Sequence, residues 1–132
     1  MTHYLNGMRR AAILEDRSIL TLTGADARDF LQGLVTADMA QCVPGHALYT
    51  ALLTPQGKIL YEFFMAQADE ERFLVDCAAP RAADLVKRLG LYKLRAKVTM
   101  APSSDSVAAV WDGNALAARD GILGVKIGRA HV

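Results

Sequence analysis

The chain has 132 residues, enough for about one domain with a single buried core. Its hydrophobic content of 52% and charged content of 22% are typical of a globular protein and exclude a disordered one. Fifteen Lys and Arg nearly balance fourteen Asp and Glu, so the composition gives no support for a general electrostatic attraction to nucleic acid or to an anionic membrane, and a local basic patch is left open as an alternative. Charged residues interrupt the apolar stretches before the roughly 18–20 residues that a membrane span needs, and no signal-peptide core follows Arg9 and Arg10. We therefore expect a cytoplasmic monomer that binds neither nucleic acid nor membrane directly.

The first part of the chain predicts two strands and a helix. Residues 11–14 and 18–23 are short apolar runs, which we expect to form strands joined by a tight connection. Thr23-Gly24-Ala25-Asp26 matches a helix start, in which hydroxyl and carboxylate groups satisfy free backbone N–H groups. Apolar residues then recur at helical spacing, so this helix should lay one face on a sheet. Gly33 lies near its expected end.

The middle of the chain predicts a strand meander. Residues 47–53 and 58–66 flank Thr54-Pro55-Gln56-Gly57, in which proline presets the backbone of a turn and glycine completes it. A third strand is expected over residues 73–77.

A second helix and two further strands follow. The helix is expected over residues 81–89, since Pro80 lies at its start and Gly90 is placed to stop it. Residues 98–101 and 107–111 have the pattern of strands.

This order of elements predicts the fold class. Blocks of adjacent strands favour an α+β fold with a largely antiparallel sheet and two packed helices, not a doubly wound parallel sheet. We expect an N-terminal extension over residues 1–10, one domain over 11–113 and an irregular tail over 114–132. The last six residues, 127–132, match what one reading frame of a widely used sequencing adapter encodes. We interpret them as non-biological, with an ordinary disordered tail as the alternative.

Catalytic and metal-binding motifs are absent from the sequence. There is no glycine-rich phosphate loop, no Gly-x-Ser-x-Gly elbow and no His-Glu-x-x-His. Cys42 and Cys77 lack the spacing of a metal site or a disulfide framework, so we interpret both as buried small apolar residues. His46 follows Pro44-Gly45, which is typical of a loop residue rather than a base. We expect no metal site and no catalytic residue.

Glu62 is the most informative residue of the predicted strands. Alternation places it on one face with Lys58 and Leu60, while Ile59 and Tyr61 lie on the other face. A carboxylate among apolar neighbours costs free energy unless it is paired or exposed. Glu62 therefore needs a partner or a function.

Two other segments have a simple structural interpretation and a functional alternative. In residues 31–38 a helix runs into a Thr-x-Asp turn, where Asp38 is expected to orient a loop through backbone N–H groups. In residues 91–98 three cations, Lys93, Arg95 and Lys97, alternate with apolar residues. These cations are either a solvated edge or the rim of a site for an acidic ligand tail or phosphate.

Taken in order, four stretches resemble the N-terminal part of the YgfZ branch of the aminomethyltransferase-like folate-binding proteins. The resemblance covers about residues 11–101 and rests on the ordered combination of motifs. The stretches are Thr23-Gly24-Ala25-Asp26-Ala27, Phe30-Leu31-Gln32-Gly33-Leu34-Val35-Thr36-Ala37-Asp38, Leu53-Thr54-Pro55-Gln56-Gly57-Lys58-Ile59-Leu60 and Leu91-Tyr92-Lys93-Leu94-Arg95-Ala96-Lys97-Val98.

This resemblance implies a partial folate-binding domain over residues 11–113. In the related glycine cleavage T-protein, an aspartate beside the folate ring matches the position of Glu62. Tetrahydrofolate or a derivative is then the expected cofactor, with Glu62 near the pteridine ring and Tyr49 and Tyr61 as apolar walls. The remaining candidates, for the glutamate carboxylates of the ligand, are Lys58, Arg95 and Lys97.

The resemblance also implies a function. YgfZ-type proteins support assembly or repair of iron–sulfur proteins and, through them, tRNA modification, so iron–sulfur client proteins are the expected partners. The family's Lys-Gly-Cys-aromatic-x-Gly-Gln-acid signature does not occur in this chain. Two alternatives remain open: a tetrahydrofolate-dependent aminomethyltransferase, and an interaction module that binds no ligand.

Overall fold

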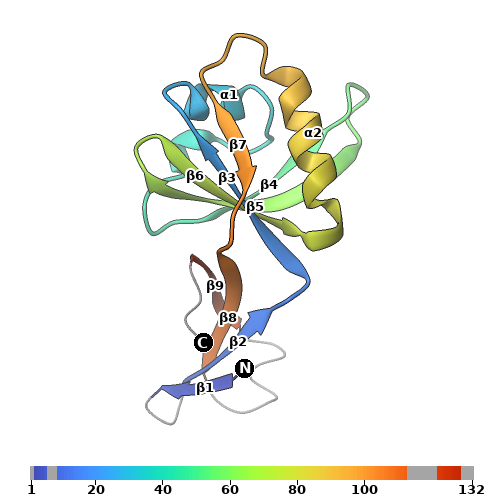
Figure 1. Ribbon diagram of the computed structural model, residues 1–132. Helices are drawn as coiled ribbons and strands as arrows, with labels where there is room; N and C mark the ends of the chain where they lie inside the picture. Colours follow the sequence, from blue (N-terminus) through green and yellow to red (C-terminus); the bar gives the residue numbers. More distant parts are fainter. Residues whose placement is uncertain (1, 6–8, 113–121, 129–132) are drawn as a thin grey trace.

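The computed structural model describes residues 2–5, 9–112 and 122–128 and has the expected α+β fold (Figure 1). Every strand pair within the described residues is antiparallel, and two α-helices pack on the larger sheet, so the predicted fold class is confirmed. The strands form two sheets. The larger has five strands in the order β4-β5-β6-β3-β7, and the smaller has four in the order β1-β2-β8-β9.

The larger sheet contains the meander that the turn at residues 54–57 predicts. Gly57 has a φ of 86°, a left-handed value that favours glycine. Its strands are β3 (Arg17–Thr23), β4 (Leu48–Leu53), β5 (Ile59–Asp69), β6 (Arg72–Ala78) and β7 (Thr99–Pro102).

One face of this sheet is buried under both helices, α1 (Ala27–Gln32) and α2 (Ala82–Tyr92). Alternate β5 residues Tyr61, Phe63 and Met65 point into this core. Burying each large apolar side chain contributes about 1.5–3 kcal/mol, so this layer holds the domain together. Glu62 and Phe64 consequently lie on the opposite face of β5, as alternation predicts.

The smaller sheet differs from the expectations for both ends of the chain. It consists of β1 (Thr2–Leu5), β2 (Arg9–Leu14), β8 (Ser106–Asp112) and β9 (Ile122–Gly128). The strands that flank residues 15–16 exist, but they do not pair with each other: β2 pairs with β8, and β3 pairs with β6 and β7. Ile19, Leu74 and Val107 form a small buried cluster with Leu14, which joins β8 to the larger sheet.

Parts of the expected extension and of the expected tail thus have regular structure. Residues 2–5 form a strand of the smaller sheet, and residues 122–128 form its edge strand next to β8. Short strands without clear alternation gave no sequence signal. Residues 113–121 and 129–132 lie outside the described part, so the origin of the last residues stays a prediction.

The start of α1 departs from the predicted capping pattern. Asp26 is the N-cap residue, but its side chain makes no capping hydrogen bond. The carboxylate Oδ2 instead accepts a hydrogen bond from the backbone N–H of Lys97 at 2.8 Å, and the Asp26 N–H donates to the Lys97 carbonyl at 3.3 Å. The predicted helix start thus binds the loop before β7.

Gly24 is required at this joint. Its φ is 140°, and a Cβ atom there would lie 1.9 Å from the Lys97 carbonyl oxygen. No side chain fits between these two backbones, so glycine allows the contact.

The second helix extends past its predicted end. Gly90 lies inside α2, which ends at Tyr92. A glycine inside a helix costs only about 1 kcal/mol, and the burial of Leu85 and Leu89 outweighs that cost. Among the described residues, neither helix is long and apolar enough to cross a membrane.

Candidate functional site

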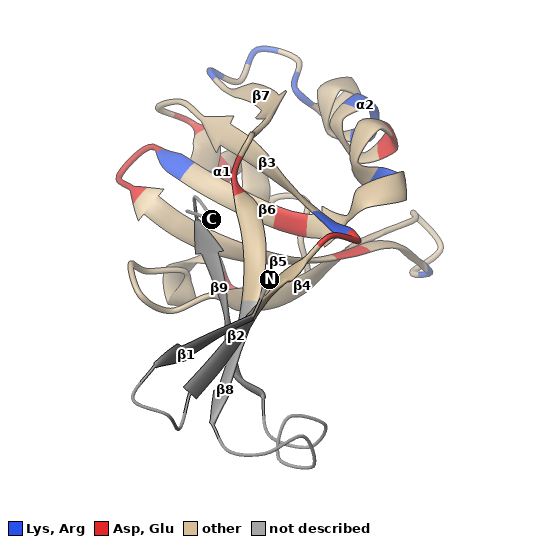
Figure 2. Ribbon diagram, turned by 60° about the horizontal axis from the view of Figure 1, so that its bottom comes forward, with Lys and Arg blue, Asp and Glu red and all other residues tan. Residues whose placement is uncertain are grey.

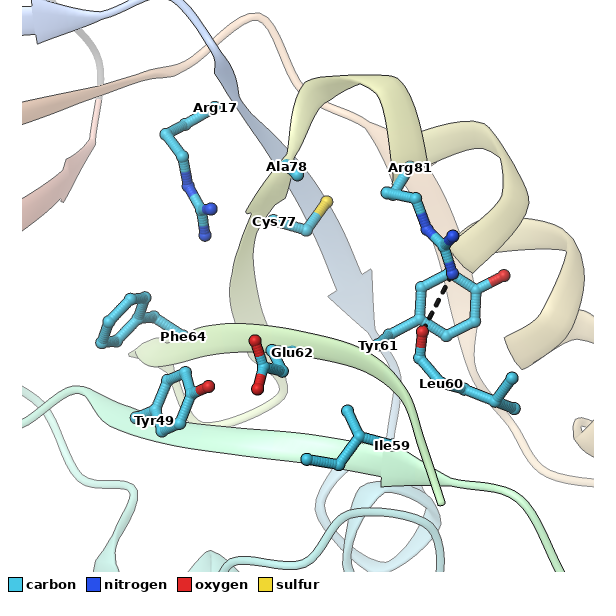
Figure 3. A pocket seen from close by; sticks show the side chains of 10 residues that line it. All are labelled: Arg17, Tyr49, Ile59, Leu60, Tyr61, Glu62, Phe64, Cys77, Ala78 and Arg81. Carbon is cyan, nitrogen blue, oxygen red and sulfur yellow. Dashed lines mark hydrogen bonds between the residues drawn. The ribbon is translucent and has the colours of Figure 1, made fainter.

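An open pocket of about 430 Å³ lies where two neighbouring strands of the larger sheet separate. Strands β5 and β6 pair from Phe64 and Asp76 onward, whereas β5 stays paired with β4 back to Ile59. Meanwhile β6 follows β3 as far as the pair between Ala78 and Arg17. We call this opening the strand fork. It is lined by Arg17, Tyr49, Ile59, Leu60, Tyr61, Glu62, Phe64, Cys77, Ala78 and Arg81 (Figure 3).

The acid of the pocket is Glu62, which lies on the exposed face of β5. The pKa of the exposed Tyr49 hydroxyl is raised, first by hydrogen bonding to the Glu62 carboxylate, then by desolvation and by the negative charge of Glu62, while the charge of Arg17 opposes the rise. The Tyr49 and Phe64 rings lie 5.1 Å apart at an interplanar angle of 54°. Glu62 therefore interacts with Tyr49 and lies beside two aromatic rings, those of Tyr49 and Phe64.

Arg81, at the start of α2, lines one side of the pocket. Its Nη2 donates a hydrogen bond to the Leu60 carbonyl at 2.9 Å, where β5 has separated from β6 (Figure 3). Its guanidinium carbon lies 4.4 Å from the centroid of the Tyr61 ring, a cation–π contact. The arginine therefore supplies a hydrogen bond to a backbone carbonyl beyond the end of the β5–β6 pairing.

Arg17 lies on the other side of the pocket and is held by Asp76. Arg17 Nε lies 2.7 Å from Asp76 Oδ1, and Nη2 donates to the Asp76 carbonyl at 3.0 Å. The Asp76 side chain is only 1% exposed, and within the described part of the chain its Oδ2 has no hydrogen-bond partner. Burial raises the pKa of the Asp76 carboxyl, and the neighbouring Arg17 opposes this effect.

The pocket combines three kinds of chemistry. Glu62 accepts hydrogen bonds, Arg17 and Arg81 donate them and carry positive charge, and aromatic rings supply flat apolar walls. This set suits a planar, polar ring system that has both donors and acceptors.

The structure brings together only part of the predicted site. Tyr49, Tyr61 and Glu62 share the strand fork. Lys58 is exposed in the turn before β5 and does not line the fork.

The two predicted cations of the loop between α2 and β7 also lie elsewhere. Lys97 lines a different hollow with Thr23, Gly24 and Glu71, and Arg95 is exposed in the same loop. Three of the six predicted residues therefore share one pocket, and the assignment of all six to a folate site stays a prediction.

Sequence reasoning missed Arg17 and Arg81. Each lies next to a recognisable local feature, the Glu15-Asp16 turn and Pro80 respectively. Long-range strand pairing brings them into the same pocket as Glu62, and the sequence carries no local signal for that pairing.

In the segment 31–38, Asp38 orients a loop through a backbone N–H group, as the simpler interpretation predicts. Asp38 Oδ1 accepts a hydrogen bond from the Ala40 N–H at 2.9 Å and caps a short 3₁₀-helix, Met39–Gln41. The Gln32 amide bridges the same loop, with its Oε1 accepting from the Met39 N–H at 2.8 Å. These residues orient the loop between α1 and β4.

The described residues contain no cluster of three or more potential metal ligands. Cys42 and Cys77 are free and buried, as predicted. Burial raises the pKa of both thiols, which disfavours the thiolate that metal binding or nucleophilic attack requires.

Comparison with known proteins identifies relatives of the chain. Residues 5–111 match the family described as the GCVT N-terminal domain. An iron-sulfur cluster assembly factor IBA57 homolog, mitochondrial, from Pyricularia oryzae is 37% identical over 101 residues, which cover 74% of this chain and 26% of that protein. The homolog of the same name from Aspergillus oryzae is 32% identical over 114 residues, covering 76% and 26%. The chain thus spans about a quarter of the length of these curated relatives.

A solved structure supports the fold. The glycine cleavage system aminomethyltransferase T from Bartonella henselae superimposes with a TM-score of 0.69 at 20% identity, covering 86% of this chain and 32% of that one. At this identity the likeness concerns the fold. Because the family match spans most of the described residues, the chain belongs to the GCVT N-terminal domain family of the aminomethyltransferase-like superfamily.

Proposed function

We propose that this domain binds tetrahydrofolate or a derivative in the strand fork, within a YgfZ-type accessory protein for iron–sulfur cluster assembly or repair. The observation that carries the proposal is the meeting of Glu62 and Tyr49 in one pocket beside Phe64. The names of the curated relatives, iron-sulfur cluster assembly factors, support the cellular role. An effect on tRNA modification would follow indirectly, through iron–sulfur enzymes that modify tRNA.

The pteridine ring would lie against the aromatic walls of the fork. Its amino and ring N–H groups would donate to the Glu62 carboxylate, a charge-assisted hydrogen bond. Arg17 and Arg81 line the same pocket and are better placed than Arg95 or Lys97 to meet carbonyl or carboxylate oxygens of the ligand. The Tyr49 hydroxyl interacts with the Glu62 carboxylate in the same pocket, so the two side chains would face the ligand together.

Titration of the intact protein with tetrahydrofolate tests the binding claim. We expect Glu62→Ala to weaken binding by about tenfold to a hundredfold, because a hydrogen bond to a charged group contributes about 1.5–3 kcal/mol. Glu70→Ala is a matched control, since Glu70 is exposed in the turn between β5 and β6 and does not line the fork. Equal affinities of the native protein and Glu62→Ala would remove Glu62 from the site.

The cellular role is tested separately. In cells that lack the protein, we expect the native form to restore the activity of an iron–sulfur enzyme and Glu62→Ala to restore it poorly, at equal protein abundance. Full rescue by a variant that no longer binds tetrahydrofolate would separate the cellular role from folate.

A further inference from the structure

The end of α2 and the loop after it expose leucines within a cluster of positive charge. We call this region the α2-end surface. It comprises Lys87, Arg88, Leu91, Tyr92, Lys93, Leu94 and Arg95. Leu94 is 90% exposed and Leu91 is 70% exposed, and Tyr92 is also exposed. Large apolar side chains in such a group often mark a contact with another molecule.

One of these leucines, Leu94, has a strained backbone conformation. Leu94 has a φ of 44°, and no other described residue except glycine has a positive φ. Its turn is closed by a hydrogen bond from the Ala96 N–H to the Lys93 carbonyl at 2.8 Å. Glycine or asparagine would relieve the strain of this conformation, so a leucine here needs a reason beyond the turn itself.

The charge of this region is one-sided. Residues 87–97 include five Lys and Arg and no Asp or Glu, although the whole chain has a net charge of only +1. Figure 2 shows these basic residues along α2 and the loop that leads to β7. Favourable interaction with a helix C-terminus explains cations here, but it does not explain the exposed leucines.

A groove lies beside one of the two exposed leucines, Leu91. One stripe of α2, made of Asp84, Lys87, Arg88 and Leu91, borders an open hollow of about 370 Å³ together with Tyr61. This volume is enough for apolar side chains of a partner, and the two cations Lys87 and Arg88 border it together with one carboxylate, that of Asp84.

Other classes of partner fit this surface less well. A membrane-surface helix needs a broad apolar face, but the apolar stripe of α2, with Leu85 and Leu89, is buried against the sheet. Single-stranded nucleic acid binds to aromatic stacking platforms, whereas the apolar centre here is mainly leucine. Leucines bordered by cations match an acidic protein segment that carries apolar side chains.

We propose that the α2-end surface docks an acidic segment of a partner protein, whose apolar side chains pack on Leu91 and Leu94 while its carboxylates meet the surrounding cations. This proposal does not depend on folate binding, because the variants that test it leave Glu62 and Tyr49 unchanged.

The test uses fluorescence anisotropy with the 132-residue chain and two synthetic peptides. One peptide combines Glu with Leu, and the other has the same charge with Ser in place of each Leu. We expect the leucine peptide to bind about tenfold tighter or more, as burial of a leucine predicts. Binding of the leucine peptide should weaken as salt is added.

Two variants locate the binding. Leu94→Gly should lose about tenfold in affinity for the leucine peptide while its melting temperature stays equal or rises, since glycine suits a positive φ. Arg95→Glu should weaken both peptides through charge. Val43→Ser is the matched control, because Val43 is an exposed apolar residue outside this surface, and its affinities should match those of the native chain.

Three results would overturn the proposal. One is equal affinity for the two peptides, which would leave charge alone. Another is unchanged leucine-peptide binding in Leu94→Gly. A third is Leu94-dependent binding to anionic phospholipid vesicles or to single-stranded RNA that is tighter than binding to the leucine peptide.

Discussion

The interaction between Tyr49 and Glu62 is the most direct residue-scale property of the strand fork. A neutral phenol donates to the carboxylate, whereas a phenolate would be repelled by it, so the pKa of Tyr49 lies above its ordinary value of 10.0. In Glu62→Gln the negative charge is gone and the pKa of Tyr49 should fall toward that value. Ring-labelled tyrosine, followed by NMR against pH, measures the change.

Glu70→Gln is the control for this titration. It removes the same charge from an exposed turn that does not line the fork, and the pKa of Tyr49 should stay as it is in the native protein. If the pKa of Tyr49 were the same in Glu62→Gln and in Glu70→Gln, Tyr49 and Glu62 would not interact. The proposed folate site would then lose the contact that orients its carboxylate.

At the scale of elements, the contact between the start of α1 and the loop before β7 depends on Gly24. Gly24→Ala should lower the free energy of unfolding by about 3 kcal/mol, because φ is 140° there and the added Cβ meets the Lys97 carbonyl. Urea unfolding measures this loss.

Two other glycines calibrate the result. Gly57→Ala should cost only about 1 kcal/mol, since φ is 86° but nothing lies within 4 Å of the added Cβ. Gly90→Ala should raise stability by about 0.5–1 kcal/mol, because Gly90 lies in α2 with open space around it. Equal losses at Gly24 and Gly57 would show that the Lys97 contact is not tight.

Elements with a strong local pattern were predictable from the sequence. The turn that ends at Gly57 sets the pairing of β4 with β5, and alternation along β5 then puts Glu62 and Phe63 on opposite faces. Helix α2 was found from its apolar stripe, although Gly90 proved too weak a signal to end it. Strands β1 and β9 were missed because their sequences show no clear alternation.

The candidate site was only partly predictable, for a different reason. Tyr49 and Glu62 are neighbours through a short hairpin, so local reasoning places them on one face. Arg17 and Arg81 join them because β6 leaves β5 and follows β3, a choice made by contacts distant in sequence. Conversely, Arg95 and Lys97 look like ligand cations in the sequence, yet the fold carries them to the far end of α2.

At the scale of the whole molecule, Asp76 couples stability to pH. It pairs across the sheet with Ile19, which packs on Val107 of β8, so the carboxylate is buried near the junction of the two sheets. Its folded-state pKa is raised by burial. Its contribution to stability is therefore fully present below the unfolded pKa of about 3.9 and is lost as pH rises through the raised folded value.

Urea unfolding of the native protein and of Asp76→Asn across this pH window tests the coupling. The asparagine variant does not titrate at residue 76, so its stability relative to the native protein should rise with pH, by at most about 1.4 kcal/mol per pH unit. Arg17→Met should extend the native loss to higher pH, because Arg17 opposes the rise in the Asp76 pKa. If the stability of Asp76→Asn relative to the native protein stays constant or falls as pH rises, Arg17 fully compensates the buried carboxylate of Asp76. The Arg17–Asp76 pair would then stabilise the junction of the sheets instead of weakening it at neutral pH.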